Sequence, residues 1–308
     1  MRLTFWINKI QDALRWYSHV YWDRFRCRFL KFPEVMSIED SIDLAVKNNM
    51  SITRFGDGEL SLMCGRDLNF QSYQPELARK MEKAIRSVNK RLLVCIPDCF
   101  SETSLGNLCS TDERFWRSHL LFFRRQWHKR LDVGRKYGNT WLSRIYSMKW
   151  DQEEARKIFS HLENLWIDRD VVIIEGAKSR IGVGNDCFQK AKSIRRILGP
   201  AKNSFSAYDA IFTEAIKITE NPLFIIAMGP SATAMAYELT ELGYQALDLG
   251  HLDVEFEWMR MGMKTKSPVR GKFVNEAVLT GNSDSEVIGE LTAEEWQQYQ
   301  SEIIAAFE

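Results

Sequence analysis

Two acidic side chains lie one residue apart in the stretch TRFGDGEL. Asp57 and Glu59 follow Gly56 and Gly58, and Arg54 comes shortly before them. Two carboxylates on a glycine-rich turn can point at one divalent cation and give it hard oxygen ligands, while the cation neutralises a bound diphosphate. The Asp-x-Glu pattern is also common in ordinary turns. The stretch by itself therefore leaves a metal site and plain turn chemistry both open.

A glycine-rich stretch, EGAKSRIGVGND, occupies residues 175–186 and follows an expected buried strand at 171–174. We expect it to lead into a helix over 186–198, where free N–H groups and the helix dipole favour an anion. The stretch lacks G-x-G-x-x-G and is not followed by G-K-[ST], so a simple helix cap is the alternative to a phosphate cradle. The candidate nucleotide-binding residues in it are Glu175, Ser179, Arg180, Gly182, Gly184, Asn185 and Asp186.

Two later loops also follow expected strands. DLGHLDVEFEW contains His251 and a second pair of acids, Asp253 and Glu255, of which Asp253 can alternatively cap the next helix. The five histidines show no paired spacing with cysteine, which disfavours zinc, and a serine hydrolase would need a G-x-S-x-G elbow that the sequence lacks. MGPSATA begins a helix at which a phosphate or a ribose can bind. Its candidate residues are Gly229, Pro230 and Ser231.

Short apolar runs alternate with segments of helical periodicity along most of the chain. This alternation predicts an α/β fold with a Rossmann-like, mostly parallel sheet flanked by helices. Ligands bind beyond the carboxyl ends of the strands in such sheets. We therefore expect one pocket from the loops at 54–59, 175–186, 229–233 and 249–257. The expected strands are 51–54, 92–96, 140–145, 171–174, 223–228 and 245–249.

The first 31 residues combine helically spaced aromatic side chains with seven lysines and arginines. Such an amphipathic helix can lie on an anionic membrane surface, or it can dock on its own domain. The whole chain has 42 basic against 41 acidic residues, so a nucleic-acid partner is not expected. Six cysteines without a C-x-x-C pair fit a reducing cytoplasm. We expect a cytoplasmic protein, either free or peripheral at the inner face of the membrane.

The four loops, in this order, resemble the signature segments of the GT-D fold glycosyltransferases, most specifically around EGAKSRIGVGND. The resemblance covers roughly residues 37–275. It implies a Rossmann-like domain that transfers a hexose, of the glucose or galactose type, from a UDP-sugar to a bacterial glycan. We accordingly divide the chain into a basic aromatic helix at 1–32, a GT-D-like domain at 33–280 and a C-terminal tail with a short helix at 281–308.

The resemblance also implies roles for particular residues. Asp57 and Glu59 take the family's Asp-x-Glu role, in catalysis and in holding a divalent cation, usually manganese, with magnesium as the alternative. The other three loops hold the nucleotide and diphosphate. The acceptor is then a lipid-linked or protein-linked glycan.

The expected mechanism neutralises the departing UDP with the cation and with Arg54 or Arg180. If the reaction inverts the anomeric centre, a carboxylate must also deprotonate the acceptor. The candidates for this base are Glu255, Asp253 and Glu175. Two other functions fit the same residues: a metal-dependent nucleotide phosphohydrolase, and a nucleotide-binding module without catalytic activity.

Overall fold

The computed structural model describes residues 18, 21, 22, 25, 29–274 and 289–308. They form an α/β fold around one eight-stranded sheet of order β3-β2-β1-β7-β6-β4-β5-β8. Every pair of neighbouring strands in this described part is parallel, which confirms the predicted fold class. The strands are β1 (Ser51–Arg54), β2 (Leu92–Ile96), β3 (Gly138–Asn139), β4 (Asp170–Gly176), β5 (Ser193–Gly199), β6 (Leu223–Ala227), β7 (Gln245–Asp248) and β8 (Ile303–Ala306).

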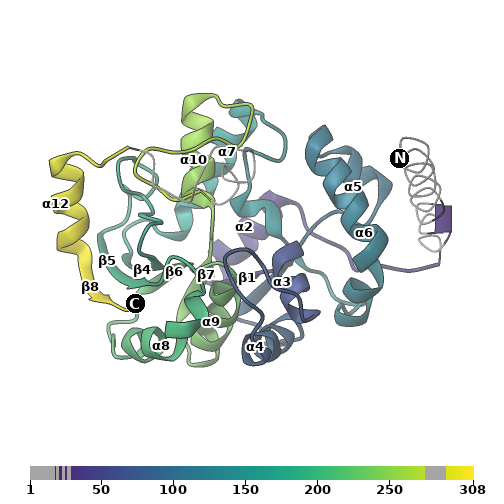
Figure 1. Ribbon diagram of the computed structural model, residues 1–308, viewed down its shortest axis with the longest axis horizontal. Helices are drawn as coiled ribbons and strands as arrows, with labels where there is room; N and C mark the ends of the chain where they lie inside the picture. Colours follow the sequence, from purple (N-terminus) through teal and green to yellow (C-terminus); the bar gives the residue numbers. More distant parts are fainter. Residues whose placement is uncertain (1–17, 19–20, 23–24, 26–28, 275–288) are drawn as a thin grey trace, which may run out of the picture.

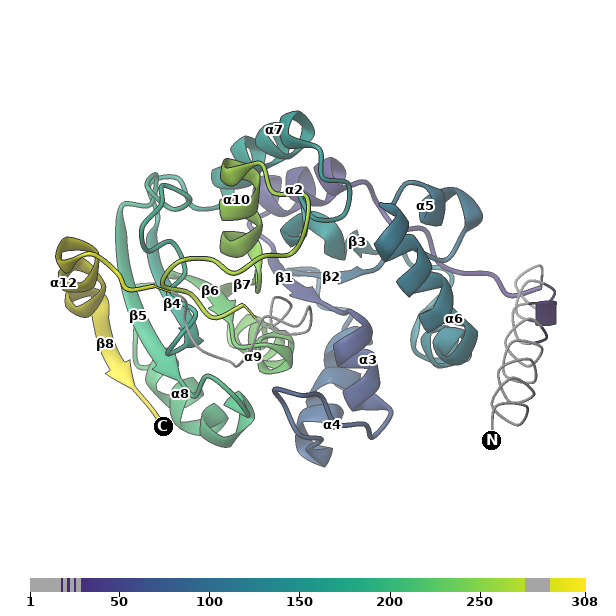
Figure 2. The same ribbon diagram turned by 45° about the horizontal axis from the view of Figure 1, so that its top comes forward.

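Helices cover both faces of the sheet (Figures 1 and 2). The central strands β2 and β6 are buried throughout, because parallel strands between two helical layers must be apolar on both sides. One face packs against α3 (Asp57–Met63), α4 (Pro75–Ile85), α6 (Ser110–Arg130), α8 (Tyr208–Ile216) and α9 (Pro230–Glu241). The other face packs against α2 (Ile38–Lys47), α7 (Gln152–Leu162) and α10 (Leu252–Met261). The short α5 (Glu102–Gly106) lies beside α6.

The helix predicted over 186–198 is wrong: residues 193–199 form strand β5. The apolar residues of this segment fit a helical stripe, but the segment pairs along its full length with β4 and also pairs with β8. Arg196, which would face solvent on an amphipathic helix, is buried between two carboxylates. Long-range pairing therefore overrides the local pattern.

Two further element predictions need correction. The strand predicted at 140–145 is the 3₁₀ helix η1 (Thr140–Ser143), and β3 is the two-residue strand just before it. The short helix expected in the C-terminal tail at 281–308 is α12 (Ala293–Glu302), but the four residues after it form the unpredicted strand β8 at the edge of the sheet. The chain end is thereby fixed to the sheet by backbone hydrogen bonds, such as the one from Phe307 N–H to Leu198.

The predicted helix at 1–32 lies mostly outside the described residues, so its membrane contact stays a prediction. The side chains of Tyr21, Trp22, Phe25 and Phe29 are exposed. Among the residues described, none of the helices is both long and apolar enough to span a bilayer.

Candidate active site at the carboxyl edge of the sheet

A cavity of about 590 Å³ lies at the carboxyl edge of the sheet. The loops after β1, β4, β5, β6 and β7 contribute to its wall, and so does the segment after β3. The four loops identified in the sequence therefore meet in one cavity, as a parallel sheet requires. The predicted site residues that line it are Arg54, Gly56, Asp57, Glu59, Ser179, Gly229, Pro230, His251 and Asp253.

The acidic pair lies in the first turn of α3 rather than on a free turn. Asp57 is the first residue of this helix, and Gly56 caps it in an extended conformation. The Glu59 carboxylate accepts a hydrogen bond from Gly56 N–H at 2.8 Å, which satisfies an amide at the helix start. A Cβ atom at Gly56 would lie 3.1 Å from that carboxylate. Glycine therefore allows the close approach that holds Glu59 in place.

Glu59 is surrounded mainly by other acids. Burial, followed by the negative charges of Asp248 and Asp57, raises its pKa to about 7, against the opposing effects of a backbone hydrogen bond and, to a smaller extent, of Arg54. Asp248, the last residue of β7, also lines the cavity. The sequence analysis missed this residue, although an acid at the end of a buried strand is a recognisable signal. Three carboxylates thus share one region of the cavity.

Arg54 is held rigidly beside these acids. Its guanidinium donates to the Asp248 carboxylate at 2.9 Å and to the Asp248 backbone carbonyl at 2.7 Å. Gly250 passes close to it with φ of 43°, and a Cβ atom there would collide with the guanidinium. Arg180, the other candidate cation, instead donates to the Gly271 carbonyl at 2.8 Å and lies over the Trp296 ring. Of these two arginines, Arg54 is the one that lines the cavity.

The loop after β4 does not form the predicted phosphate cradle. It leads to strand β5, so no helix dipole is directed at a ligand there. Its amides also donate within the protein: Ile181 N–H to the Glu175 carboxylate at 2.7 Å, and Gly182 N–H to Asp253 at 2.9 Å. Ser179 faces the cavity. The remaining candidates from this loop, which lie outside the cavity lining, are Glu175, Arg180, Gly182, Gly184, Asn185 and Asp186.

Two of the three candidate bases are structural. Glu175 is fully buried and pairs with Arg196 at 2.6 Å. Glu255 is fully buried as well, and it accepts hydrogen bonds from the N–H and the hydroxyl of Ser147 at 2.7 and 2.5 Å. Burial raises the pKa of both carboxyls, and their partners oppose that effect. Neither carboxylate faces the cavity, so we do not assign either as a base.

Asp253 lines the cavity but its carboxylate is already bonded. It forms a buried ion pair with Lys272 and accepts hydrogen bonds from Gly182 N–H and from the Asn185 side chain at 2.9 and 2.7 Å. This arrangement fixes the loop after β4 against the start of α10. The residue thus has a positioning role in the wall of the cavity.

The start of α9 is the part of the cavity best suited to an anion. Gly229, with φ of 53°, turns the chain so that Pro230 begins the helix, whose first turn contains no acid. The positive end of a helix dipole favours negative charge, and Lys202 from the loop after β5 also lines the cavity. Ser231, in contrast, is fully buried, and its hydroxyl accepts a hydrogen bond from Ser204.

The cavity also has a wall that the sequence analysis missed. Trp116 from α6 lines it together with Thr140, Trp141 and Arg144 from the segment after β3. The error at 140–145 explains the omission of Thr140, Trp141 and Arg144, because a strand there would have been part of the sheet rather than of the cavity wall. We call these four residues the tryptophan wall.

Comparison with known proteins identifies the family. Residues 52–277 match the family model described as glycosyltransferase GT-D fold. The chain belongs to this family. It is also similar to a solved GT-D structure described as domain of unknown function 1792 with a distinct glycosyltransferase fold, with a TM-score of 0.84 and 34% identity. That match covers 93% of this chain and all of the other.

Other similar proteins agree with this membership. A solved glycosyltransferase of the same domain type from Streptococcus sanguinis gives a TM-score of 0.82 at 35% identity, over 90% of this chain and all of the other. The "Probable glycosyl transferase Gly" of Streptococcus gordonii is 37% identical over 88% of this chain, and "Glycosyltransferase GlyD" of Streptococcus pneumoniae serotype 4 is 36% identical over 90%. The GT-D chain spans only 38% and 33% of these two proteins.

The carboxylates that line the GT-D cavity suit a hard divalent cation whose other ligands are oxygen atoms of a bound phosphate. In the described part of the chain, no group of three histidine, cysteine or acidic side chains is gathered closely enough to hold a metal alone. Asp57 and Glu59 are two carboxylates in one helical turn, and the repulsion that raises the pKa of Glu59 would be relieved by a cation. Manganese and magnesium commonly bind one or two carboxylates together with phosphates.

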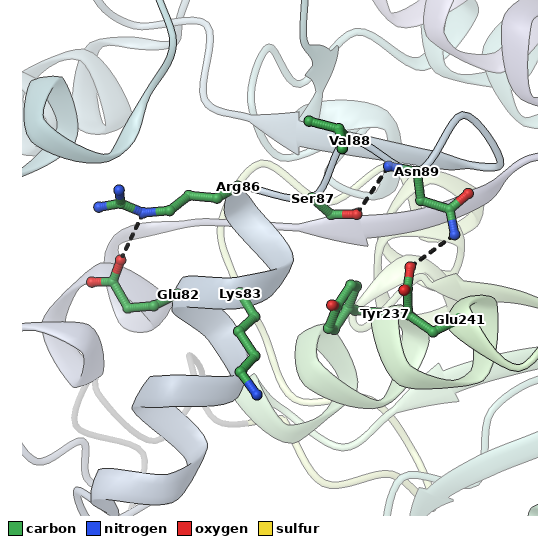
Figure 3. A pocket seen from close by; sticks show the side chains of 8 residues that line it. All are labelled: Glu82, Lys83, Arg86, Ser87, Val88, Asn89, Tyr237 and Glu241. Carbon is green, nitrogen blue, oxygen red and sulfur yellow. Dashed lines mark hydrogen bonds and ion pairs between the residues drawn. The ribbon is translucent and has the colours of Figure 1, made fainter.

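A second hollow lies at the opposite, amino edge of the sheet, between the ends of α4 and α9 (Figure 3). Its volume is about 890 Å³, and its polar side chains bond to one another, as Arg86 does to Glu82 and Asn89 to Glu241. It contains neither the Asp-x-Glu pair nor the strand ends at which ligands of such sheets bind. We therefore assign the chemistry to the carboxyl-edge cavity.

Proposed function

We propose that this GT-D protein transfers a hexose from a UDP-sugar to a bacterial glycan, with a divalent cation at Asp57 and Glu59. One observation carries the proposal: a single cavity combines this acidic pair with a helix start that favours anions. A nucleotide diphosphate bound with a cation needs both features. The domain itself has a glycosyltransferase fold, because it belongs to the GT-D family.

Each part of the cavity has a proposed role. The start of α9 and Lys202 orient the diphosphate. Bound manganese, or magnesium in its place, would neutralise the charge that develops on the departing UDP. Arg54, fixed by its ion pair with Asp248, is proposed to donate hydrogen bonds near the same position without any rearrangement. His251 and Ser179 line the remaining wall and are proposed to contact the nucleotide sugar.

The acceptor is proposed to be a lipid-linked or protein-linked glycan. A pocket for an acceptor must adjoin the acidic pair, because the hydroxyl and the anomeric carbon have to meet there. The cavity extends beyond α3 to the tryptophan wall, so it has room on that side.

The test is to incubate the purified protein with manganese and a panel of UDP-sugars, and to measure UDP and inorganic phosphate separately. We expect slow UDP release, a clear preference for one UDP-hexose, and loss of release when EDTA removes the cation. Phosphate release from UDP itself would instead support the nucleotide phosphohydrolase. Tight UDP binding with no turnover of any donor would support a non-catalytic nucleotide-binding module.

A further inference from the structure

The tryptophan wall is the part of the cavity to which the proposed UDP-sugar site assigns no role. Trp116 and Trp141 come from different elements, and their ring centroids lie 5.3 Å apart with the planes at 67°. Trp116 is only 4% exposed, whereas Trp141 is partly exposed at the cavity wall. The edge-to-face contact thus supports one indole with another and leaves part of Trp141 for a ligand.

This wall is already ordered by the protein around it. The backbone N–H of Trp141 donates to the Asn139 side chain at 2.9 Å, and the backbone N–H of Asn139 donates to the Ser41 hydroxyl at 2.9 Å. A few residues further on, Glu255 holds the N–H groups of Tyr146 and Ser147. Both ends of the segment are therefore fixed, which lowers the entropy that a ligand would lose in ordering it.

The charge of the wall distinguishes it from the start of α9. Arg144 contributes a cation, but the buried Glu255 carboxylate lies 4.0 Å from it and balances that charge. The other lining groups are two indoles and the Thr140 hydroxyl. Such a surface suits a neutral ligand with one apolar face and several hydroxyl groups, rather than a diphosphate.

A pyranose ring has this chemistry, because its axial C–H groups form an apolar face while its hydroxyls point outward. We propose that Trp141, supported by Trp116, is the platform on which the acceptor's terminal sugar stacks. The proposal rests on the proposed function, since it places an acceptor beside a donor. In the sheet, strand β1, which leads to Asp57 and Glu59, lies between β3 and β6, so the acidic pair comes between the tryptophan wall and the start of α9.

The first experiment measures binding of neutral sugars directly. The probes are the methyl glycosides of glucose, galactose and N-acetylglucosamine, observed by saturation-transfer NMR with the full chain, UDP and magnesium. We expect at least one glycoside to bind, and Trp141→Leu to weaken that binding at least about fivefold. Leucine keeps an apolar side chain in the fold but removes the flat ring. Trp141→Phe should retain most of the binding.

The controls separate this proposal from its alternatives. Trp296→Leu changes a 45% exposed tryptophan outside the cavity and should leave glycoside binding unchanged. UDP affinity, measured by calorimetry, should stay within twofold in Trp141→Leu. A large loss of UDP affinity would make Trp141 a nucleotide-base contact and overturn the proposal, and so would absence of glycoside binding to the unsubstituted protein. Failure of that protein to bind UDP would instead contradict the proposed function.

Discussion

Glu59 comes shortly after strand β1 and Glu175 lies near the carboxyl end of strand β4, so both are at the same edge of the sheet, but their neighbours carry opposite charges. The charged groups around Glu59 are chiefly Asp248 and Asp57, which raise its pKa further than burial does alone. Around Glu175 the main charged neighbour is Arg196, which opposes the effect of burial. The cavity faces Glu59, whereas Glu175 is fully enclosed.

The difference shows that carboxylates at one edge of the sheet can have different roles: one stabilises the fold, and others are available to a ligand. A buried carboxylate that is paired with an arginine has its charge satisfied by the fold. Carboxylates that repel one another in an open cavity destabilise the empty protein, and a bound cation would relieve that repulsion. The first arrangement fixes the wall of the site, and the second suits it to a charged ligand.

The largest expected effect comes from breaking the buried ion pair between Glu175 and Arg196. Arg196→Met leaves Glu175 buried without its guanidinium and removes the partner of Glu302. Breaking a buried pair from one side typically lowers the free energy of unfolding by about 3–5 kcal/mol. Urea denaturation measures this loss, which should become smaller as the pH falls, because burial raises the pKa of Glu175 and its protonation removes the unpaired charge.

An exposed ion pair provides the matched control for that variant. Arg270→Met removes the contact with Glu295 at 2.6 Å, in which the arginine side chain is 51% exposed. Such surface pairs contribute no more than about 1 kcal/mol. If Arg196→Met and Arg270→Met lowered the free energy of unfolding equally, this would contradict the distinction between enclosed and solvent-exposed ion pairs.

The second prediction concerns the cavity carboxylates. The double variant Asp57→Asn, Glu59→Gln should reduce UDP-sugar turnover by about 100- to 1000-fold, because both proposed cation ligands lose their charge. Its melting temperature should not fall, because the substitutions remove negative charges that raise the pKa of Glu59. Turnover assays with manganese, together with a thermal melt, measure both quantities. An active double variant would refute the proposed cation site.

The smallest expected effect is a pH dependence of stability. Because the pKa of Glu59 is raised to about 7 in the folded protein, ionisation there opposes folding as the pH rises from about 4.5 through 7. Glu59→Gln cannot ionise, and its side-chain oxygen can still accept from Gly56 N–H. With EDTA present, its melting temperature relative to the unsubstituted protein should therefore increase between pH 5 and pH 8. A constant difference across this range would contradict the raised pKa of Glu59.

Much of the fold follows from local patterns in the sequence. The apolar runs of β2 and β6 end abruptly at a proline and at a glycine, and such runs predict buried strands without any tertiary information. Strand β5 could not be recognised in this way, because the spacing of its apolar residues also fits a helix. Arg196 is buried in this strand, where Glu175 and Glu302 both pair with its guanidinium.

The sequence by itself determined the class of the fold and four of the loops that meet at its carboxyl edge, because the alternation of apolar runs with helical periodicity predicts a parallel sheet. Only the tertiary structure decided which acids face the cavity. Arg54 and Asp248 are 194 residues apart, and Glu255 meets Ser147 from 108 residues away. Whether a carboxylate meets a cation, an amide or another carboxylate depends on such distant partners, and this environment sets its charge and its role.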